Sequence, residues 1–167
     1  MMNNMLDTYL NYETWMLRYF IGRCRDITPE QMHQAFNIGQ GSVYDTVGHI
    51  VRNLEAWTDL MSGNPIRKLP KFPEDIDSCL ERFDAAMTDF TDCSRAIAAS
   101  NRLDDTYLDT IAEPPLRKSL GGTILHVLTH TTGHRWELQH MLQRLGLADL
   151  IEGDVQEWEL RTQNNAR

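Results

Sequence analysis

Cysteine is scarce in this sequence, and its spacing forms no recognisable framework. Cys24, Cys79 and Cys93 are the three cysteines among 167 residues. An odd number of widely spaced cysteines predicts neither a disulfide scaffold nor a C-x-x-C metal or redox motif. We therefore expect reduced, partly buried thiols, as is typical of a cytoplasmic protein.

Basic charge and long apolar runs are also lacking. The chain has 16 Lys and Arg residues against 24 Asp and Glu residues, a formal net charge of −8. Because nucleic acids are usually bound by a basic surface, this balance argues against a nucleic-acid partner. No apolar run reaches the roughly 20 residues of a membrane-spanning helix, and the amino terminus does not read as a signal peptide. These absences predict a cytoplasmic protein with no membrane partner.

Several common catalytic and nucleotide-binding motifs are missing as well. The sequence contains neither a phosphate-binding G-x-x-x-x-G-K-[ST] loop nor a G-x-S-x-G nucleophile elbow. Gly39 and Gly41 are not followed by the third glycine of the dinucleotide fingerprint. The length fits one hydrophobic core, so we expect residues 1–167 to form a single domain.

What the sequence does contain is helical periodicity. Apolar residues recur at three- and four-residue steps, which predicts helices over about residues 3–25, 42–61 and 74–100, and a last one that opens after Gly121 and Gly122 and runs to about residue 145. Ser42 and Asp45 have the spacing of a capping box at the start of the second helix. Gly146 fits the stop position after the last one.

The connections between these helices differ in character. Residues 65–73 hold three prolines and predict a long extended connector. Residues 101–119 lack a helical period and predict an irregular strap, in which residues 106–111 form either a short strand or an extended segment. The tail, residues 147–167, has room for one short helix. We therefore expect an all-α four-helix bundle whose topology is not a plain up-down-up-down.

Histidine is the residue type that points to chemistry. His126, His130 and His134 recur every four residues in the last predicted helix. Such residues lie about 40° apart around a helix, so two of their imidazoles can bind one metal ion. On a helical wheel, His134 falls within the apolar stripe, His130 on its flank and His126 at its rim. The wheel favours His130 and His134 as the inward pair and leaves His126 as an outer or surface residue.

A metal site between helices needs a ligand from a second helix. His49 is the only histidine of the second predicted helix, and it lies about 100° from the middle of that helix's apolar face. This position suits a site near the mouth of the bundle, where a small molecule can reach the ion. Hydrogen-bonded core histidines remain the alternative, and the H-E-x-x-H of metalloproteases is missing.

Two stretches of the sequence resemble the DinB family of metalloproteins, which is distinct from the DNA polymerase of the same name. Gly41 and Ser42, with His49–Val51 and Glu55–Trp57, resemble the second helix of that family. LHVLTHTTGHR at residues 125–135, followed by MLQRLG at residues 141–146, resembles its last core helix.

The resemblance implies a bundle of the DinB/YfiT-like type, commonly a homodimer, with a divalent metal held by three histidines. Carried over to this chain, the ligands are His49, His130 and His134. Zinc or nickel is the favoured ion, with iron and manganese as alternatives. Relatives include thiol-S-transferases that use bacillithiol or mycothiol. The resemblance therefore implies a metal-dependent enzyme acting on a small-molecule substrate, such as a low-molecular-weight thiol.

The chain departs from the family pattern directly after the last ligand. The family often has Arg-Gly-Gln there, whereas this sequence has Arg135, Trp136 and Glu137. Glu137, and Asp45 one turn before His49, are candidates for orienting a ligand or carrying a proton. A solvated surface carboxylate is nevertheless the interpretation that the sequence favours for both.

Two other functions stay open at this point. One is a non-enzymatic stress protein that binds a metal or a small molecule. A fourth protein ligand, for which His126 is the candidate, would favour it, because closed metal sites are structural and open ones catalytic. The other is a metal-free bundle that only dimerises through an exposed helix face.

Overall fold

Residues 5–68 and 70–164 are described by the computed structural model. Its elements in chain order are α1 (Met5–Arg23), η1 (Cys24–Asp26), α2 (Pro29–Met32), α3 (Val43–Met61), α4 (Ile76–Ala99), β1 (Thr106–Asp109), β2 (Leu116–Ser119), α5 (Leu120–Arg144) and α6 (Val155–Asn164). The long helices α1, α3, α4 and α5 correspond to the four predicted ones, and α6 to the predicted short helix in the tail. The predicted start of the first helix, at about residue 3, lies outside the described residues.

The start of α3 and the end of α5 lie where the sequence predicts them, whereas α5 begins before Gly121 and Gly122 and not after them. The Ser42 hydroxyl accepts the backbone N–H of Asp45 and donates to its carboxylate, so Ser42 caps α3 as predicted, while the carboxylate bonds to this hydroxyl and not to the backbone N–H that a capping box would use. At the start of α5, the Ser119 hydroxyl accepts the N–H of Gly122. Gly146 follows the last turn of α5 with a φ of 102°, a conformation that glycine adopts readily.

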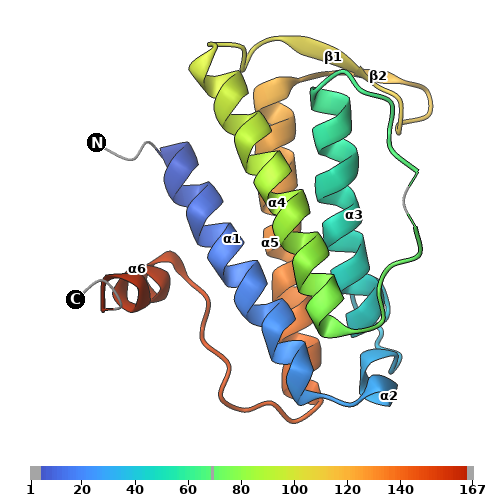
Figure 1. Ribbon diagram of the computed structural model, residues 1–167, viewed down its shortest axis with the longest axis vertical. Helices are drawn as coiled ribbons and strands as arrows, with labels where there is room; N and C mark the ends of the chain where they lie inside the picture. Colours follow the sequence, from blue (N-terminus) through green and yellow to red (C-terminus); the bar gives the residue numbers. More distant parts are fainter. Residues whose placement is uncertain (1–4, 69, 165–167) are drawn as a thin grey trace.

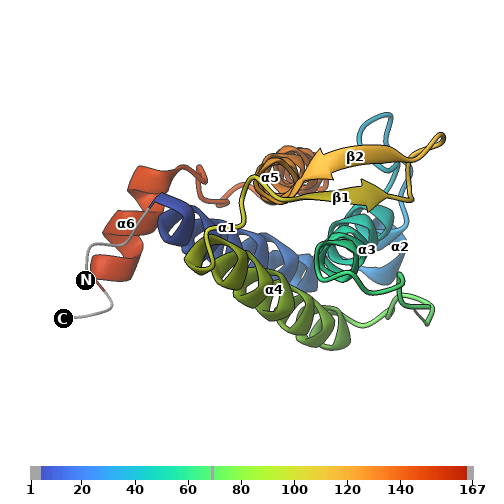
Figure 2. The same ribbon diagram turned by 90° about the horizontal axis from the view of Figure 1, so that it is seen from above.

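The arrangement of the long helices explains the length of one connection. Seen from above, α1 and α3 lie at opposite corners, and each of them packs against both α4 and α5 (Figure 2). In the view of Figure 1, α1 and α5 run downward while α3 and α4 both run upward. The connector between α3 and α4 therefore has to cover the length of the bundle. The topology thus departs from up-down-up-down, as expected.

Phe72 anchors that connector against α3. Its side chain is 2% exposed, and the guanidinium groups of Arg52 and Arg82 lie 5.7 and 5.3 Å from the centre of its ring. The Tyr44 hydroxyl donates to the Phe72 carbonyl. A Cβ at Gly48 would lie only 3.3 Å from the Phe72 ring, so glycine lets the connector pass close to α3 at this position. His49 is the next residue of the same helix.

The connection between α4 and α5 is a hairpin, which corrects the expectation of an irregular strap. Strands β1 and β2 pair antiparallel, with Thr106 opposite Ser119 and Asp109 opposite Leu116. Of the two alternatives for residues 106–111, the strand is right over Thr106–Asp109. The second strand escaped the sequence analysis because Arg117 and Lys118 interrupt any alternation of apolar and polar residues. Apart from this two-stranded sheet, the regular structure of the described residues is helical.

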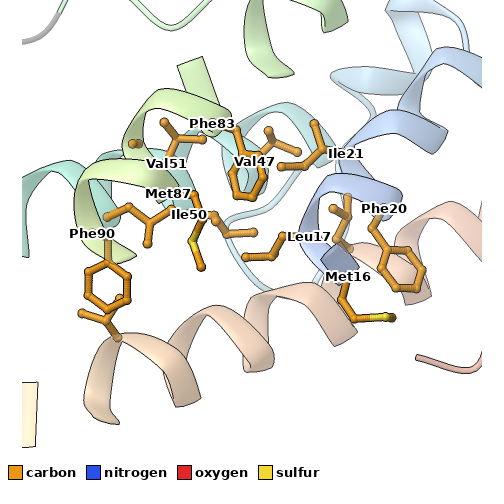
Figure 3. Packing of buried hydrophobic residues seen from close by; sticks show 14 of the residues in the cluster. Met16, Leu17, Phe20, Ile21, Val47, Ile50, Val51, Phe83, Met87 and Phe90 are labelled. Atoms are coloured by element: carbon orange, nitrogen blue, oxygen red, sulfur yellow. The ribbon is translucent and has the colours of Figure 1, made fainter. Parts of the chain in front are cut away.

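The core fills the space between the long helices. Figure 3 shows side chains that α1, α3 and α4 direct toward one another: Met16, Leu17, Phe20, Ile21, Val47, Ile50, Val51, Phe83, Met87 and Phe90. Apolar residues of α5, including Leu138 and Leu142, join the same cluster. Burial of this surface is the main force that holds α3 and α5 side by side. None of the described helices combines the length and the apolar character needed to cross a membrane.

Candidate metal centre

The packing of α3 against α5 brings the three predicted ligands together. Ligand nitrogens of His49, His130 and His134 all lie within 4.8 Å of one another. The Nε2 atoms of His49 and His130 are 3.2 Å apart. The centre of the His134 ring lies 4.6 Å from that of His49 and 4.4 Å from that of His130. The predicted trio therefore converges on one point between two helices, while its occupation by a metal stays a prediction.

The three rings are partly withdrawn from water. His134 is 8% exposed, and His49 and His130 are half-buried, as their positions at the edge of the apolar stripes suggest. Burial and the neighbouring imidazoles lower the pKa of His49 to about 4 and also lower the pKa of His130. Neutral imidazole is the form that binds metal ions, so both rings are ready as ligands at neutral pH.

Glu137 fixes the orientation of His134. Its Oε2 lies 2.6 Å from Nδ1 of His134, one turn earlier on α5. With its proton on Nδ1, the imidazole donates to the carboxylate and keeps a lone pair on Nε2. That Nε2 is buried and has no hydrogen-bond partner among the residues that the structure describes. A buried nitrogen without a partner, on a ring held by a carboxylate, fits a metal ligand in a histidine site.

The loop before α3 holds Glu137 in place. Gly39 has a φ of +55°, and a Cβ at this position would lie 2.5 Å from Oε2 of Glu137. Only a residue without a side chain lets the backbone approach the carboxylate so closely. Glu137 is therefore not the solvated surface carboxylate that the sequence favoured. Asp45 is exposed and bonded to the Ser42 hydroxyl, which agrees with that interpretation.

Asn53 is a member of the site that sequence reasoning missed. Its side-chain nitrogen lies 2.7 Å from Nε2 of His49 and 3.1 Å from Nε2 of His130. A signal was present in the sequence, because Asn53 follows His49 by four residues, the same spacing that separates His130 from His134. Polar residues at this spacing share one face of a helix.

His126 lies outside the group of converging nitrogens. Its side chain is exposed, and its ring stacks on that of His130 with 5.3 Å between centres and 15° between planes. The rings of His126 and Trp57 are nearly perpendicular, with 5.5 Å between their centres and 78° between their planes. The rim position on the helical wheel predicted such an outer residue.

A cavity opens beside His126, between α3, β2 and the first turn of α5. Its volume is about 270 Å³, and its lining residues are Trp57, Lys118, Ser119, Gly122, Thr123 and His126. The ammonium group of Lys118 lies 4.7 Å from the centre of the Trp57 ring and 2.7 Å from Oδ2 of the buried Asp109. The cavity thus offers a small molecule an aromatic wall and a fixed N–H donor next to the histidines.

The fold and the histidine cluster define a mostly helical protein with a candidate three-histidine metal centre. The family model that matches this chain is that of the DinB family, over residues 1–159. The chain therefore belongs to the DinB family.

Solved structures from two bacteria share the fold. One is a protein from Exiguobacterium sibiricum 255-15 described as a DinB family member, with a TM-score of 0.63 and 21% identity, covering 89% of this chain and 95% of that one. Another is a DinB-like protein from Bacillus cereus ATCC 10987, with a TM-score of 0.67 and 14% identity, covering 84% and 91%. No curated protein matches this chain significantly.

Proposed function

We propose that the chain is a divalent-metal protein that works as a metal-dependent enzyme on small molecules, most plainly as a thiol-S-transferase. The observation that carries this proposal is the buried, unpartnered Nε2 of His134, which belongs to the same cluster as His49 and His130. Three histidine bases converge between two helices, and a metal ion would accept their lone pairs.

The donor set indicates which chemistry the site would support. Three neutral imidazoles suit zinc or nickel, with iron and manganese as alternatives, and they leave the ion its full positive charge. When bound, the ion would lower the pKa of a thiol or water molecule that it holds, which supplies a nucleophile at neutral pH.

The residues around the histidines have roles that do not depend on the metal ion. Glu137 keeps the proton of His134 on Nδ1, and Gly39 keeps Glu137 in contact with that ring. The cavity lined by Trp57 and Lys118 would hold the part of a substrate that lies away from the reacting atom. Because Lys118 supplies N–H donors there, a substrate with a polar or acidic group is favoured.

The proposed partners are a low-molecular-weight thiol as cosubstrate and a second copy of the chain in a homodimer. Both proposals rest on the family resemblance. Light scattering of the purified protein would measure the assembly, and a screen of thiols with electrophilic acceptors would measure the activity.

The first test is the metal content of protein purified without a histidine tag, measured by elemental mass spectrometry. We expect roughly one divalent ion per chain in the wild type and none in the His130→Ala/His134→Ala double variant. His140→Ala is the matched control, because His140 is exposed on the same helix and lies outside the cluster. If the wild type takes up no zinc, nickel or manganese even when incubated with these ions, the proposal is wrong.

A further inference from the structure

The side chain of Asn53 lies where two histidine lone pairs meet. Its amide nitrogen is 2.7 Å from Nε2 of His49 and 3.1 Å from Nε2 of His130, and these two nitrogens are 3.2 Å apart. An Nε2 that carries no proton accepts a hydrogen bond from the amide group. Without a metal, the amide of Asn53 is therefore within hydrogen-bonding distance of both nitrogens and can donate to them.

The same side chain has a second orientation with the opposite character. The amide nitrogen and oxygen of asparagine are nearly equal in size, and a half-turn about the last side-chain torsion exchanges them. Once a cation takes the lone pairs of His49 and His130, the NH₂ group loses its acceptors and would direct its positive hydrogens at that cation. The orientation with the oxygen toward the ion is then favoured, because a carbonyl oxygen is an electron-pair donor.

We propose that Asn53 is a fourth, displaceable ligand of the metal centre and binds through its side-chain oxygen. This inference rests on the proposed function, since it presupposes a metal at His49, His130 and His134. An amide oxygen is uncharged and a weaker ligand for zinc-type ions than imidazole, so a thiolate or water can replace it. Asn53 would then fill the fourth position at rest and leave it to an incoming substrate.

This assignment replaces the fourth ligand that the sequence suggested. The His126 ring lies nearly parallel to that of His130 and is exposed, whereas the Asn53 amide nitrogen lies within 3.1 Å of a nitrogen of each of two ligands. A neutral oxygen ligand would place this site between the closed structural type and the open catalytic type. The site would be closed by a group that is easily displaced, which is compatible with catalysis.

The test compares metal binding by Asn53→Ala, Asn53→Asp and the wild type, with Asn11→Ala as matched control. Asn11 is exposed on α1, where its side chain accepts a hydrogen bond from Arg95. Zinc affinity is measured by competition with a chromophoric chelator, and the coordination of Co²⁺ by its visible absorption spectrum. We expect Asn53→Ala to bind zinc about 10-fold more weakly and to change the Co²⁺ spectrum, because water replaces the amide oxygen. Asn53→Asp, which offers only oxygen and adds a negative charge, should bind more tightly than the wild type.

The outcomes separate this inference from the proposed function. If Asn53→Ala matches Asn11→Ala in affinity and in Co²⁺ spectrum, Asn53 is not a ligand. If Asn53→Ala binds zinc more tightly, the amide competes with the metal for the lone pairs, and the inference is again overturned. Weaker binding by Asn53→Asp would contradict it too. If the wild type and Asn11→Ala both fail to bind Zn²⁺ and Co²⁺, the proposed function itself is wrong. Circular dichroism of the metal-free proteins checks that each variant is folded.

Discussion

Two adjacent residues of α5, His134 and Arg135, belong to buried polar clusters of opposite design. The guanidinium of Arg135 is fully buried, donates to the Tyr12 hydroxyl and the Gly153 carbonyl, and lies 3.4 Å from the carboxylate of Glu13. His134 faces two further bases and has a buried nitrogen with no partner among the described residues. In the Arg135 cluster, a cation contacts an anion and other hydrogen-bond acceptors. In the His134 cluster, three imidazole bases face one another.

The comparison shows that burial alone does not mark a functional site. Arg135, Glu13 and His134 are all buried, and one oxygen of Glu13 also has no hydrogen-bond partner among the described residues. Burial raises the pKa of the Glu13 carboxyl, and the positive charge of Arg135 opposes this shift. The charges of Glu13 and Arg135 nevertheless compensate each other within the chain. In the histidine cluster, Nε2 of His134 is buried and has no hydrogen-bond partner within the described part of the chain, and that deficit points to a ligand from outside.

The largest expected effect comes from breaking the compensated cluster. Arg135→Met would leave the carboxylate of Glu13 buried without its cation, which costs about 3–5 kcal/mol of unfolding free energy. Urea denaturation at neutral pH measures the loss. The Glu13→Leu/Arg135→Met double variant should recover most of it, because both buried charges are then gone. A loss no larger than that of a typical surface substitution would show that the pair does not hold this side of the bundle together.

The next effect concerns the carboxylate that orients His134. Glu137→Gln should weaken zinc binding about 10-fold, because the neutral amide holds the imidazole proton less firmly. Chelator competition measures the affinity. Glu81→Gln, at an exposed position of α4, is the control and should bind zinc as the wild type does. Equal affinities in the two variants would mean that Glu137 has no influence on the site.

A smaller effect should follow from a change in the loop that touches this carboxylate. Gly39→Ala would place a methyl group 2.5 Å from Oε2 of Glu137 and displace the carboxylate from His134. We expect a few-fold loss of zinc affinity that does not add to the loss in Glu137→Gln. Gly41→Ala is a matched control, since Gly41 also has a positive φ but its Cβ would meet nothing within 4 Å. If the losses of zinc affinity in Gly39→Ala and Glu137→Gln add up in the double variant, Gly39 does not act through Glu137.

A further prediction concerns the pH dependence of the metal-free protein. The pKa of His49 is about 4 in the folded chain, whereas an unfolded histidine titrates near about 6.5. Between these values the unfolded chain binds more protons, so the unfolding free energy should rise as the pH is raised from about 4 to about 6.5 and then level off. Subtracting the pH profile of His49→Gln removes the contribution of the carboxylates. If the unfolding free energy changes with pH equally in the wild type and in His49→Gln, the lowered pKa of His49 is contradicted.

The sequence was sufficient for the parts of the fold that depend on local pattern. The long helices follow from three- and four-residue apolar spacing, and the start of α3 and the end of α5 from Ser42 and Gly146. His130 and His134 follow from the same spacing, because residues one turn apart share a helix face. His49 was the candidate because it is the only histidine of the second predicted helix, and the resemblance to the DinB family pointed to the same residue.

The features that escaped the sequence depend on contacts between elements. Glu137 was named as a candidate for orienting a ligand, but its contacts with His134 and with the loop at Gly39 are what distinguish it from a surface glutamate. Asn53 becomes part of the site only because α5 places His130 beside α3. The second strand of the hairpin has no apolar alternation and is fixed by its pairing with β1. Each of these positions is defined by a partner that no local pattern specifies.

The distance along the chain between His49 and His130 has a consequence for the order of folding. Their Nε2 atoms meet across 81 residues of sequence, which include the connector, all of α4 and the hairpin. A chain that is still being synthesised has no complete histidine cluster until α5 has emerged and packed on α3. An ion bound there would act as a late cross-link between the second and the last long helix, and would favour the finished bundle over any partly assembled form.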